Sequence, residues 1–147
     1  RAVAEGAQVV PAIQSRLDPA SDAFQANRQR MLELVARLRA LETRTRDKSA
    51  EAKPLFDKRG QILPRERIAR LLDAGAPWLE LSSLAGYCLD NPDPEKSVPG
   101  GGMIAGIGYV SGVRAMVVAS DSGIDAGAIQ HMGREKLLRA QGLALEN

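Results

Sequence analysis

The sequence of 147 residues offers few side chains for metal binding or nucleophilic catalysis. It contains one cysteine, Cys88, and one histidine, His131. An internal disulfide is therefore excluded, and a zinc site, which needs several cysteine or histidine ligands, is not expected. The single histidine is not accompanied by a G-x-S-x-G motif, which argues against a Ser-His-Asp triad. We expect neither a metal site nor a catalytic side chain in this chain.

Aromatic residues, long apolar runs and an excess of one charge are also scarce. Aromatics make up 3% of the residues, so the core must consist of aliphatic side chains. The net charge is only +2, with acidic and basic residues interspersed, which gives no reason to expect nucleic acid as a partner. The longest apolar run, Ala115–Ala119, is far shorter than the ~20 residues that cross a bilayer. Residues 1–10 lack the pattern of a secretion signal, and we expect a cytoplasmic protein without membrane partners.

The first half of the chain predicts helices. Residues 1–20 show no periodicity and are interpreted as a flexible leader. A long amphipathic helix is predicted from about Ala23 to Ala52, capped by Asp22 with the help of Gln25 and ended by Pro54. Its apolar stripe consists of Met31, Leu34, Val35, Leu38 and Leu41. Two pairs are spaced for i,i+4 salt bridges: Glu33–Arg37 and Glu42–Arg46.

A shorter helix and an extended segment follow. Pro64 suits the first turn of a helix, Arg65–Leu72 forms its body, and Gly75 suits its C-terminal stop. Pro77–Leu84 predicts a strand or an extended edge, with Trp78 as its large apolar anchor.

The second half of the chain, after a loop at Asn91–Gly102, predicts strands. Met103–Val110 and Val113–Ala119 are joined at Ser111–Gly112, a composition typical of a tight hairpin. The second strand is apolar towards its end, which predicts a central position covered on both faces. A glycine-containing turn then leads into a helix predicted for Ala128–Asn147.

Two glycine-rich segments invite a phosphate-binding interpretation. Gly100–Gly102 and the Gly106/Gly108 pair precede a hairpin and lack a following Gly-Lys-Ser/Thr, so close strand packing explains them better. The turn Asp125–Ala128 lies between a strand and a helix N-terminus and would present free backbone amides, which suit an anion or oxyanion. The same residues also fit an ordinary strand–helix turn.

Several segments of the chain occur in an order typical of one enzyme family. They are Gly60-Gln-Ile-Leu-Pro-Arg-Glu-Arg-Ile68 with Leu71-Leu72-Asp73, Trp78-Leu-Glu-Leu-Ser82, Gly101-Gly-Met-Ile-Ala-Gly-Ile-Gly108, Val117-Val-Ala-Ser-Asp121 and Lys136-Leu-Leu-Arg-Ala-Gln141. Over roughly residues 13–147, the chain resembles the carboxyltransferase (β) subunits of biotin-dependent acyl-CoA carboxylases. Tyr87, Cys88–Glu95 and Ser97–Gly102 are similar to the branch that acts on 3-methyl-enoyl-CoA thioesters, geranyl-CoA first and methylcrotonyl-CoA next.

The resemblance implies an α/β fold of the crotonase type, a superhelix of ββα units. Residues 21–147 would form the N-terminal helices and the first ββα units of the N-terminal carboxyltransferase domain, so that the superhelix is incomplete. The implied reaction is that of a ligase in acyclic terpene or leucine catabolism, which moves a carboxyl group from carboxybiotin to the γ-carbon of the enoyl-CoA. The implied partners are the acyl-CoA substrate, an α subunit that carries biotin carboxylase and biotin, and further β subunits in a homo-oligomer.

The resemblance also indicates where substrate would bind. The family's oxyanion-hole glycines would lie beyond Asn147, so no catalytic residue is expected in this chain, which alone is predicted to be inactive. Ala126, Gly127 and Ala128 stand where members of the family usually have Gly-Gly-Ala, in a turn that borders the CoA region, and are the expected substrate-binding residues.

Two other functions remain open on the sequence. One is a carboxyacyl-CoA decarboxylase subunit of the same superfamily. The other is a non-catalytic interaction module whose Met31–Leu41 segment docks on a partner.

Overall fold

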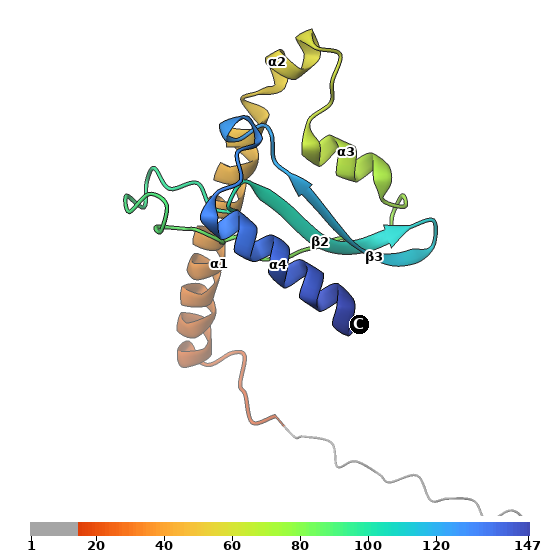
Figure 1. Ribbon diagram of the computed structural model, residues 1–147. Helices are drawn as coiled ribbons and strands as arrows, with labels where there is room; N and C mark the ends of the chain where they lie inside the picture. Colours follow the sequence, from red (N-terminus) through yellow and green to blue (C-terminus); the bar gives the residue numbers. More distant parts are fainter. Residues whose placement is uncertain (1–14) are drawn as a thin grey trace, which may run out of the picture. The chain divides into compact units, whose positions relative to one another are not determined.

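A computed structural model describes residues 15–147 (Figure 1), and these residues divide into two units between Val35 and Ala36. Of the leader predicted for residues 1–20, residues 1–14 lie outside the described part. None of the helices in residues 15–147 is long and apolar enough to cross a membrane.

The first helix, α1 (Asp22–Ala50), begins one residue earlier than the sequence predicts. Ser21 is therefore the capping residue, and its Oγ accepts a hydrogen bond from the Phe24 amide at 3.3 Å. Prediction of Asp22 as the cap is wrong because Asp22 already belongs to the first turn. The Gln25 side chain bonds a main-chain carbonyl ahead of the helix at 2.6 Å, not the amide of a capping residue.

The predicted salt bridges along α1 are absent within the described residues. Glu33 accepts a hydrogen bond from Gln29 at 3.1 Å, and Glu42 accepts one from Ser83 at 2.9 Å. An exposed i,i+4 ion pair contributes only a few tenths of a kcal/mol, so neutral donors can replace it at little cost. The apolar stripe is also largely open, since Met31 is 59% and Leu34 50% exposed.

Two short helices follow. Pro54, predicted to end the first helix, lies instead in the first turn of α2 (Lys53–Lys58), a helix that the sequence does not predict. Proline suits that position because its missing N–H would have no partner there. The predicted second helix is confirmed as α3 (Pro64–Leu71), with Gly75 at a φ of 77° after it.

The sheet has the order β1-β2-β3 and is antiparallel throughout. Its strands are β1 (Leu79–Glu80), a short remnant of the predicted Pro77–Leu84 strand, β2 (Met103–Val110) and β3 (Val113–Ser120). The predicted hairpin is confirmed: Val110 pairs with Val113, and Ser111 and Gly112 both have positive φ, at 52° and 78°. Such a pair of φ angles is that of a type I′ turn, whose twist matches the strands.

Asp73 ties the tip of the hairpin to the segment that follows α3. Its carboxylate oxygens accept hydrogen bonds from the amides of Ser111 and Gly112, both at 2.7 Å. The Asp73 amide donates to the carbonyl of Tyr109 at 2.9 Å.

The β2 glycines make room for a large ring, which confirms the packing interpretation. A Cβ atom on Gly106 would collide with the ring of Trp78, and one on Gly108 would press on Trp78 and Leu72. These glycines therefore serve the contact between β2 and the segment that leads into β1.

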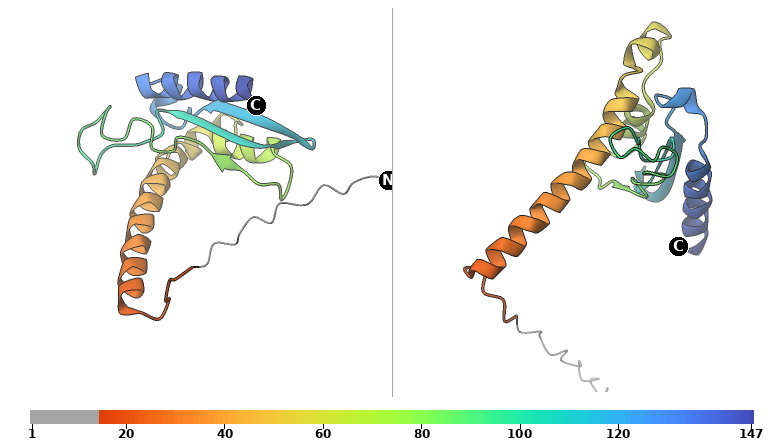
Figure 2. Two further views of the ribbon diagram at one scale, coloured as in Figure 1. Left: turned by 90° about the horizontal axis from the view of Figure 1, so that it is seen from below. Right: turned by 90° about the vertical axis from the view of Figure 1, so that its left-hand side faces the viewer.

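The last helix, α4 (His131–Glu146), covers the face of the hairpin opposite to α3 (Figure 2). It begins three residues later than predicted because the backbone between η1, a separate 3-10 turn at Asp125–Gly127, and the helix is not helical: ψ is 129° at Ala128 and 161° at Gln130. Gly133 of α4 touches Gly101 so closely that a Cβ atom on either residue would overlap the backbone of the other.

The predicted central position of β3 is wrong. Helices lie on both faces of the hairpin, but within residues 15–147 β3 pairs only with β2 and forms the edge of the sheet. Val113 and Arg114 are exposed, and Ala115–Ala119 are half-buried.

Candidate functional site

The predicted substrate-binding turn is an accessible turn and not part of a continuous helix. Asp125, Ala126 and Gly127 have φ angles of 46°, 53° and 85°, in the left-handed region. Ala126 and Ala128 are exposed, and Gly127 is half-buried. The chain therefore reverses here between the end of β3 and the start of α4.

The amides of this turn are less available than the sequence predicts. The Gly127 amide donates to the carbonyl of Ile124 at 2.9 Å, and the Ala128 amide donates to that of Asp125 at 3.0 Å. Only the Ala126 amide, of the three in the predicted site, makes no hydrogen bond to the described backbone. The tight turn consumes two donors internally, which sequence analysis does not foresee.

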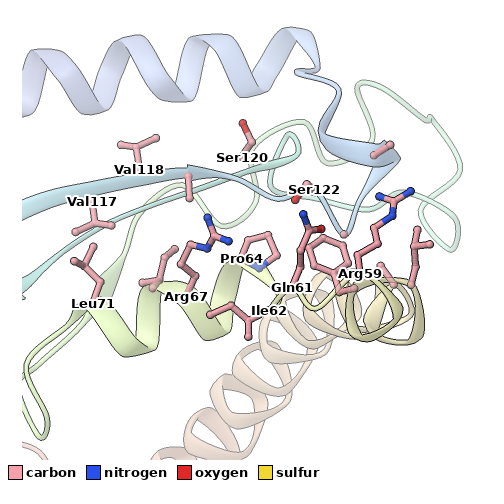
Figure 3. A pocket seen from close by; sticks show the side chains of 17 residues that line it. Arg59, Gln61, Ile62, Pro64, Arg67, Leu71, Val117, Val118, Ser120 and Ser122 are labelled. Carbon is pink, nitrogen blue, oxygen red and sulfur yellow. The ribbon is translucent and has the colours of Figure 1, made fainter.

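Ala126 lies at the border of a pocket of about 690 Å³ between α2, α3 and the end of β3. Figure 3 shows the side chains of α3 and of the segment before it facing β3 across this space. Gly127 and Ala128 are not among the lining residues. The apolar part of the lining comes mainly from Leu55, Phe56, Ile62, Ile68, Leu71, Val117 and Val118.

The charged groups that line the pocket are all cationic. Arg59 and Arg67 project into it, with Gln61 between them (Figure 3). Both arginines are exposed, and neither forms a salt bridge with a described residue. Because no carboxylate lines the pocket, these guanidinium groups are available to an anion. Apolar walls beside them suit a ligand with both an anionic and an apolar part.

The sequence does not predict Arg59 as a site residue. Arg59 directly follows α2, and this helix is not predicted because Pro54 is interpreted as the end of the preceding helix. Pro54 is the one sequence feature that could have indicated α2. Proline is common in the first turn of a helix, so it can mark the start of a new helix as well as the end of the previous one.

A buried ion cluster lies beneath the same region. Arg65 of α3 binds Glu80 of β1 through its two terminal guanidinium nitrogens, at 2.8 and 2.9 Å. Burial lowers the pKa of Arg65, but the hydrogen bonds and charge of Glu80 outweigh it and the net pKa lies above its usual value. Burial likewise raises the pKa of Glu80, and Arg65 reverses the effect, leaving that pKa below its usual value. Both groups therefore stay charged inside the fold.

Lys136 adds a second buried cation. Its side chain enters from α4, and its Nζ donates to the carbonyl of Met103 at 2.7 Å. The residue is only 5% exposed. Burial lowers its pKa to about 8, with Glu80 and Asp121 opposing this change and Arg65 adding to it.

We expect Lys136 to make the protein more stable as pH rises from 8 to 9.5. In the unfolded chain Lys136 keeps its proton up to about pH 10.5, whereas in the fold it loses the proton above about pH 8. Between these values the unfolded state binds more protons, so the free energy of unfolding increases with pH, by at most about 1.4 kcal/mol per pH unit. Urea unfolding at pH 7, 8, 9 and 9.5 measures this.

Lys136→Met should lose that increase, whereas Lys58→Met, which removes an exposed lysine, should keep it. An equal pH dependence in both variants would show that another group is responsible.

The remaining sequence candidates for catalysis do not come together. His131 is exposed at the start of α4, and Cys88 is half-buried, its amide bonded to Ser97 Oγ at 2.9 Å. Ser120 and Ser122 line the pocket without a histidine beside them. In the described part of the chain, no group of three or more His, Cys, Asp or Glu side chains is arranged to hold a metal ion.

Comparisons with known proteins match this chain to carboxyltransferases. A family model for the carboxyl transferase domain matches residues 57–147. A probable methylcrotonoyl-CoA carboxylase β chain from Drosophila melanogaster is 38% identical over 136 residues, which cover 92% of this chain and 23% of that protein. A 3-methylcrotonyl-CoA carboxylase β1 subunit from Mycobacterium tuberculosis is 46% identical over 89 residues, 60% of this chain and 16% of that protein.

A solved structure agrees with these sequence matches. The β subunit of geranyl-CoA carboxylase from P. aeruginosa superposes with a TM-score of 0.84 and 56% identity, over 92% of this chain and 25% of that one. The chain thus spans about a quarter, or less, of the proteins that it matches.

Proposed function

The chain belongs to the carboxyl transferase family, with an incomplete crotonase-like α/β fold, and on that basis we propose a specific role for the protein that contains it. That role is transfer of a carboxyl group from carboxybiotin to the γ-carbon of a 3-methyl-enoyl-CoA. Carboxyltransferases of acyl-CoA carboxylases are the enzymes to which it is homologous.

Geranyl-CoA is the proposed acyl substrate, with 3-methylcrotonyl-CoA next. Identity to the geranyl-CoA carboxylase β subunit is 56%, against 38% and 46% for the two methylcrotonyl-CoA carboxylase chains. The Cys88–Glu95 loop, which resembles the geranyl branch, supports the same order.

The observation that carries a CoA site in this chain is the pocket with two unpaired arginines beside the Ala126 turn. CoA combines phosphates, which guanidinium groups bind through charge-assisted hydrogen bonds, with a longer and less polar pantetheine arm. Arg59 and Arg67 are suited to the phosphates, and the apolar walls to the rest. Of the turn Ala126–Ala128, we assign the backbone contact to the Ala126 amide, because the other two amides are already bonded.

The proposed partners follow from the family. Biotin would be carried by an α subunit with biotin carboxylase activity, and the β subunits would form a homo-oligomer in the cytoplasm. We assign no residue of this chain to biotin and propose that the 147-residue chain alone does not turn over.

We expect the chain to bind CoA with saturable heat in isothermal titration calorimetry. Pantetheine, which lacks the phosphates, should bind at least tenfold more weakly. Arg67→Ala should weaken CoA binding about tenfold or more, since a hydrogen bond to a charged group contributes about 1.5–3 kcal/mol.

Arg139→Ala, which removes an exposed arginine from α4, is the matched control and should bind CoA normally. Absence of saturable heat, or equal losses in the two variants, would contradict this assignment.

A further inference from the structure

Asp121 occupies a position where the chain changes direction between β3 and the proposed CoA turn. Its neighbours Ser120 and Ser122 line the pocket. Successive side chains of extended backbone point to opposite sides, so the Asp121 side chain faces the interior and is only 2% exposed. A carboxylate this deeply buried needs partners.

Its partners come from parts of the chain that are distant in sequence. Ser49 Oγ, at the end of α1, donates a hydrogen bond to Asp121 Oδ1 at 2.5 Å. The Asp121 amide donates to the carbonyl of Gly102 at 2.8 Å, and the Asp121 carbonyl accepts from the Ile124 amide at 2.9 Å. The residue therefore joins α1, the loop before β2 and the first residues of the turn.

The segment after Asp121 also lies directly against α1. A Cβ atom on Gly123 would meet the carbonyl oxygen and the hydroxyl of Ser49 at 2.5 and 2.6 Å. Ser49 is itself 2% exposed. Contact at Gly123 and the hydrogen bond at Asp121 thus hold the same stretch of backbone from one residue of α1.

The second carboxylate oxygen faces the buried arginine. Asp121 Oδ2 lies 3.9 Å from Arg65 Nε, and neither atom has a hydrogen-bond partner among the described residues. The positive charge of Arg65 compensates that of Asp121 across this gap. Arg65 lies in the first turn of α3, the helix that also carries Arg67, so the cluster connects two segments whose other residues line the pocket.

From this arrangement we propose that Asp121, held by Ser49, is a positioning residue that fixes the 122–128 turn beside the pocket. It acts through the backbone of Ser122–Ile124 and does not contact ligand. The inference that it supports CoA binding rests on the proposed function, whereas the positioning of the turn does not.

Hydrogen exchange measured by NMR on the 147-residue chain tests the positioning. Asp121→Asn and Ser49→Ala should each accelerate exchange of the Ile124, Gly127 and Ala128 amides by tenfold or more, because all three are bonded within this turn. The amides of the β2–β3 hairpin should exchange as in the wild type, whereas general destabilisation would accelerate both sets.

Thr45→Val is the matched control, because Thr45 lies one turn before Ser49 on α1, is also buried, and bonds the carbonyl of Pro99 at 3.0 Å instead of a residue of the 122–128 turn. It should leave the three turn amides unchanged. Unaltered exchange in both Asp121→Asn and Ser49→Ala, or the same acceleration in Thr45→Val, would overturn the proposal.

Calorimetry with CoA on the same proteins separates the two hypotheses. Turn amides that respond as expected in a chain that does not bind CoA would leave the positioning valid and overturn the proposed function. CoA binding that is unaffected by faster turn exchange would overturn the link between them.

Discussion

Gly133→Ala should lower the free energy of unfolding by about 3 kcal/mol, the upper range for overpacking a rigid contact. The added methyl group would overlap the carbonyl oxygen of Gly101 and lie 3.1 Å from the Met103 side chain. Met103 can move, but the Gly101 backbone cannot move without disturbing the start of β2. The helix α4 must therefore shift away from the sheet. Urea unfolding followed by circular dichroism measures the loss.

Gly142→Ala is the matched control on the same helix. A Cβ atom on Gly142 would meet nothing within 4 Å, so this change should raise stability by up to about 1 kcal/mol through helix propensity. Equal stability of the two variants would show that α4 does not approach Gly101 as described.

Arg65→Met should cost up to about 3–5 kcal/mol, because the buried Asp121 and the largely buried Glu80 lose their nearest cation and keep only Lys136. Glu80 would lose two hydrogen bonds, and Asp121 would lose the nearest positive charge. Arg70→Met, on the exposed side of α3, should change stability by no more than about 0.5 kcal/mol. Chemical unfolding of both variants at pH 7 provides the comparison.

A double variant identifies the physical cause. Arg65→Met with Glu80→Leu removes both members of the pair and should recover part of the loss, since an apolar pair of similar volume avoids the unpaired charge. If the losses of the two single variants, Arg65→Met and Glu80→Leu, simply add in the double variant, the unpaired buried charge is excluded as the reason for the loss.

The parts of the fold that could be predicted from sequence are those bounded by turn-forming residues and by residues that start or end helices. Ser111–Gly112 alone specifies a two-residue turn, and a two-residue turn fixes the register of the strands that it joins. Pro64 and Gly75 bracket α3 in the same way. Such elements depend on residues a few positions apart, and the sequence shows these directly.

Long-range polar contacts could not be predicted. Asp121 carries the pattern of a turn residue, and its partner Ser49 lies 72 positions away in sequence. Arg65 lies in a predicted helix and Glu80 in a separate extended segment 15 residues later. Nothing in the spacing of these residues indicates which charges will be buried together, because only the packing of α1, α3 and the sheet brings them into contact.

In the predicted binding turn too, one feature could be predicted from the sequence and another could not. Small residues at Ala126–Ala128 correctly indicate a reversal of the chain. The number of free amide donors could not be predicted, because it depends on how tightly the chain turns. The turn is tight because three consecutive residues have positive φ angles, and only one of them is glycine, the residue that adopts such angles readily. The role of the turn in binding stays a prediction.

The position of β3 at the margin of the sheet has a consequence for handling the isolated chain. Within residues 15–147, the outer main-chain groups of five consecutive uncharged residues, Ala115–Ala119, face no further strand, and no proline, lysine or bulge there discourages pairing. Such a margin is a template for intermolecular strand addition. We therefore expect the isolated chain to self-associate as its concentration rises, and a charged side chain introduced at this margin to keep it monomeric.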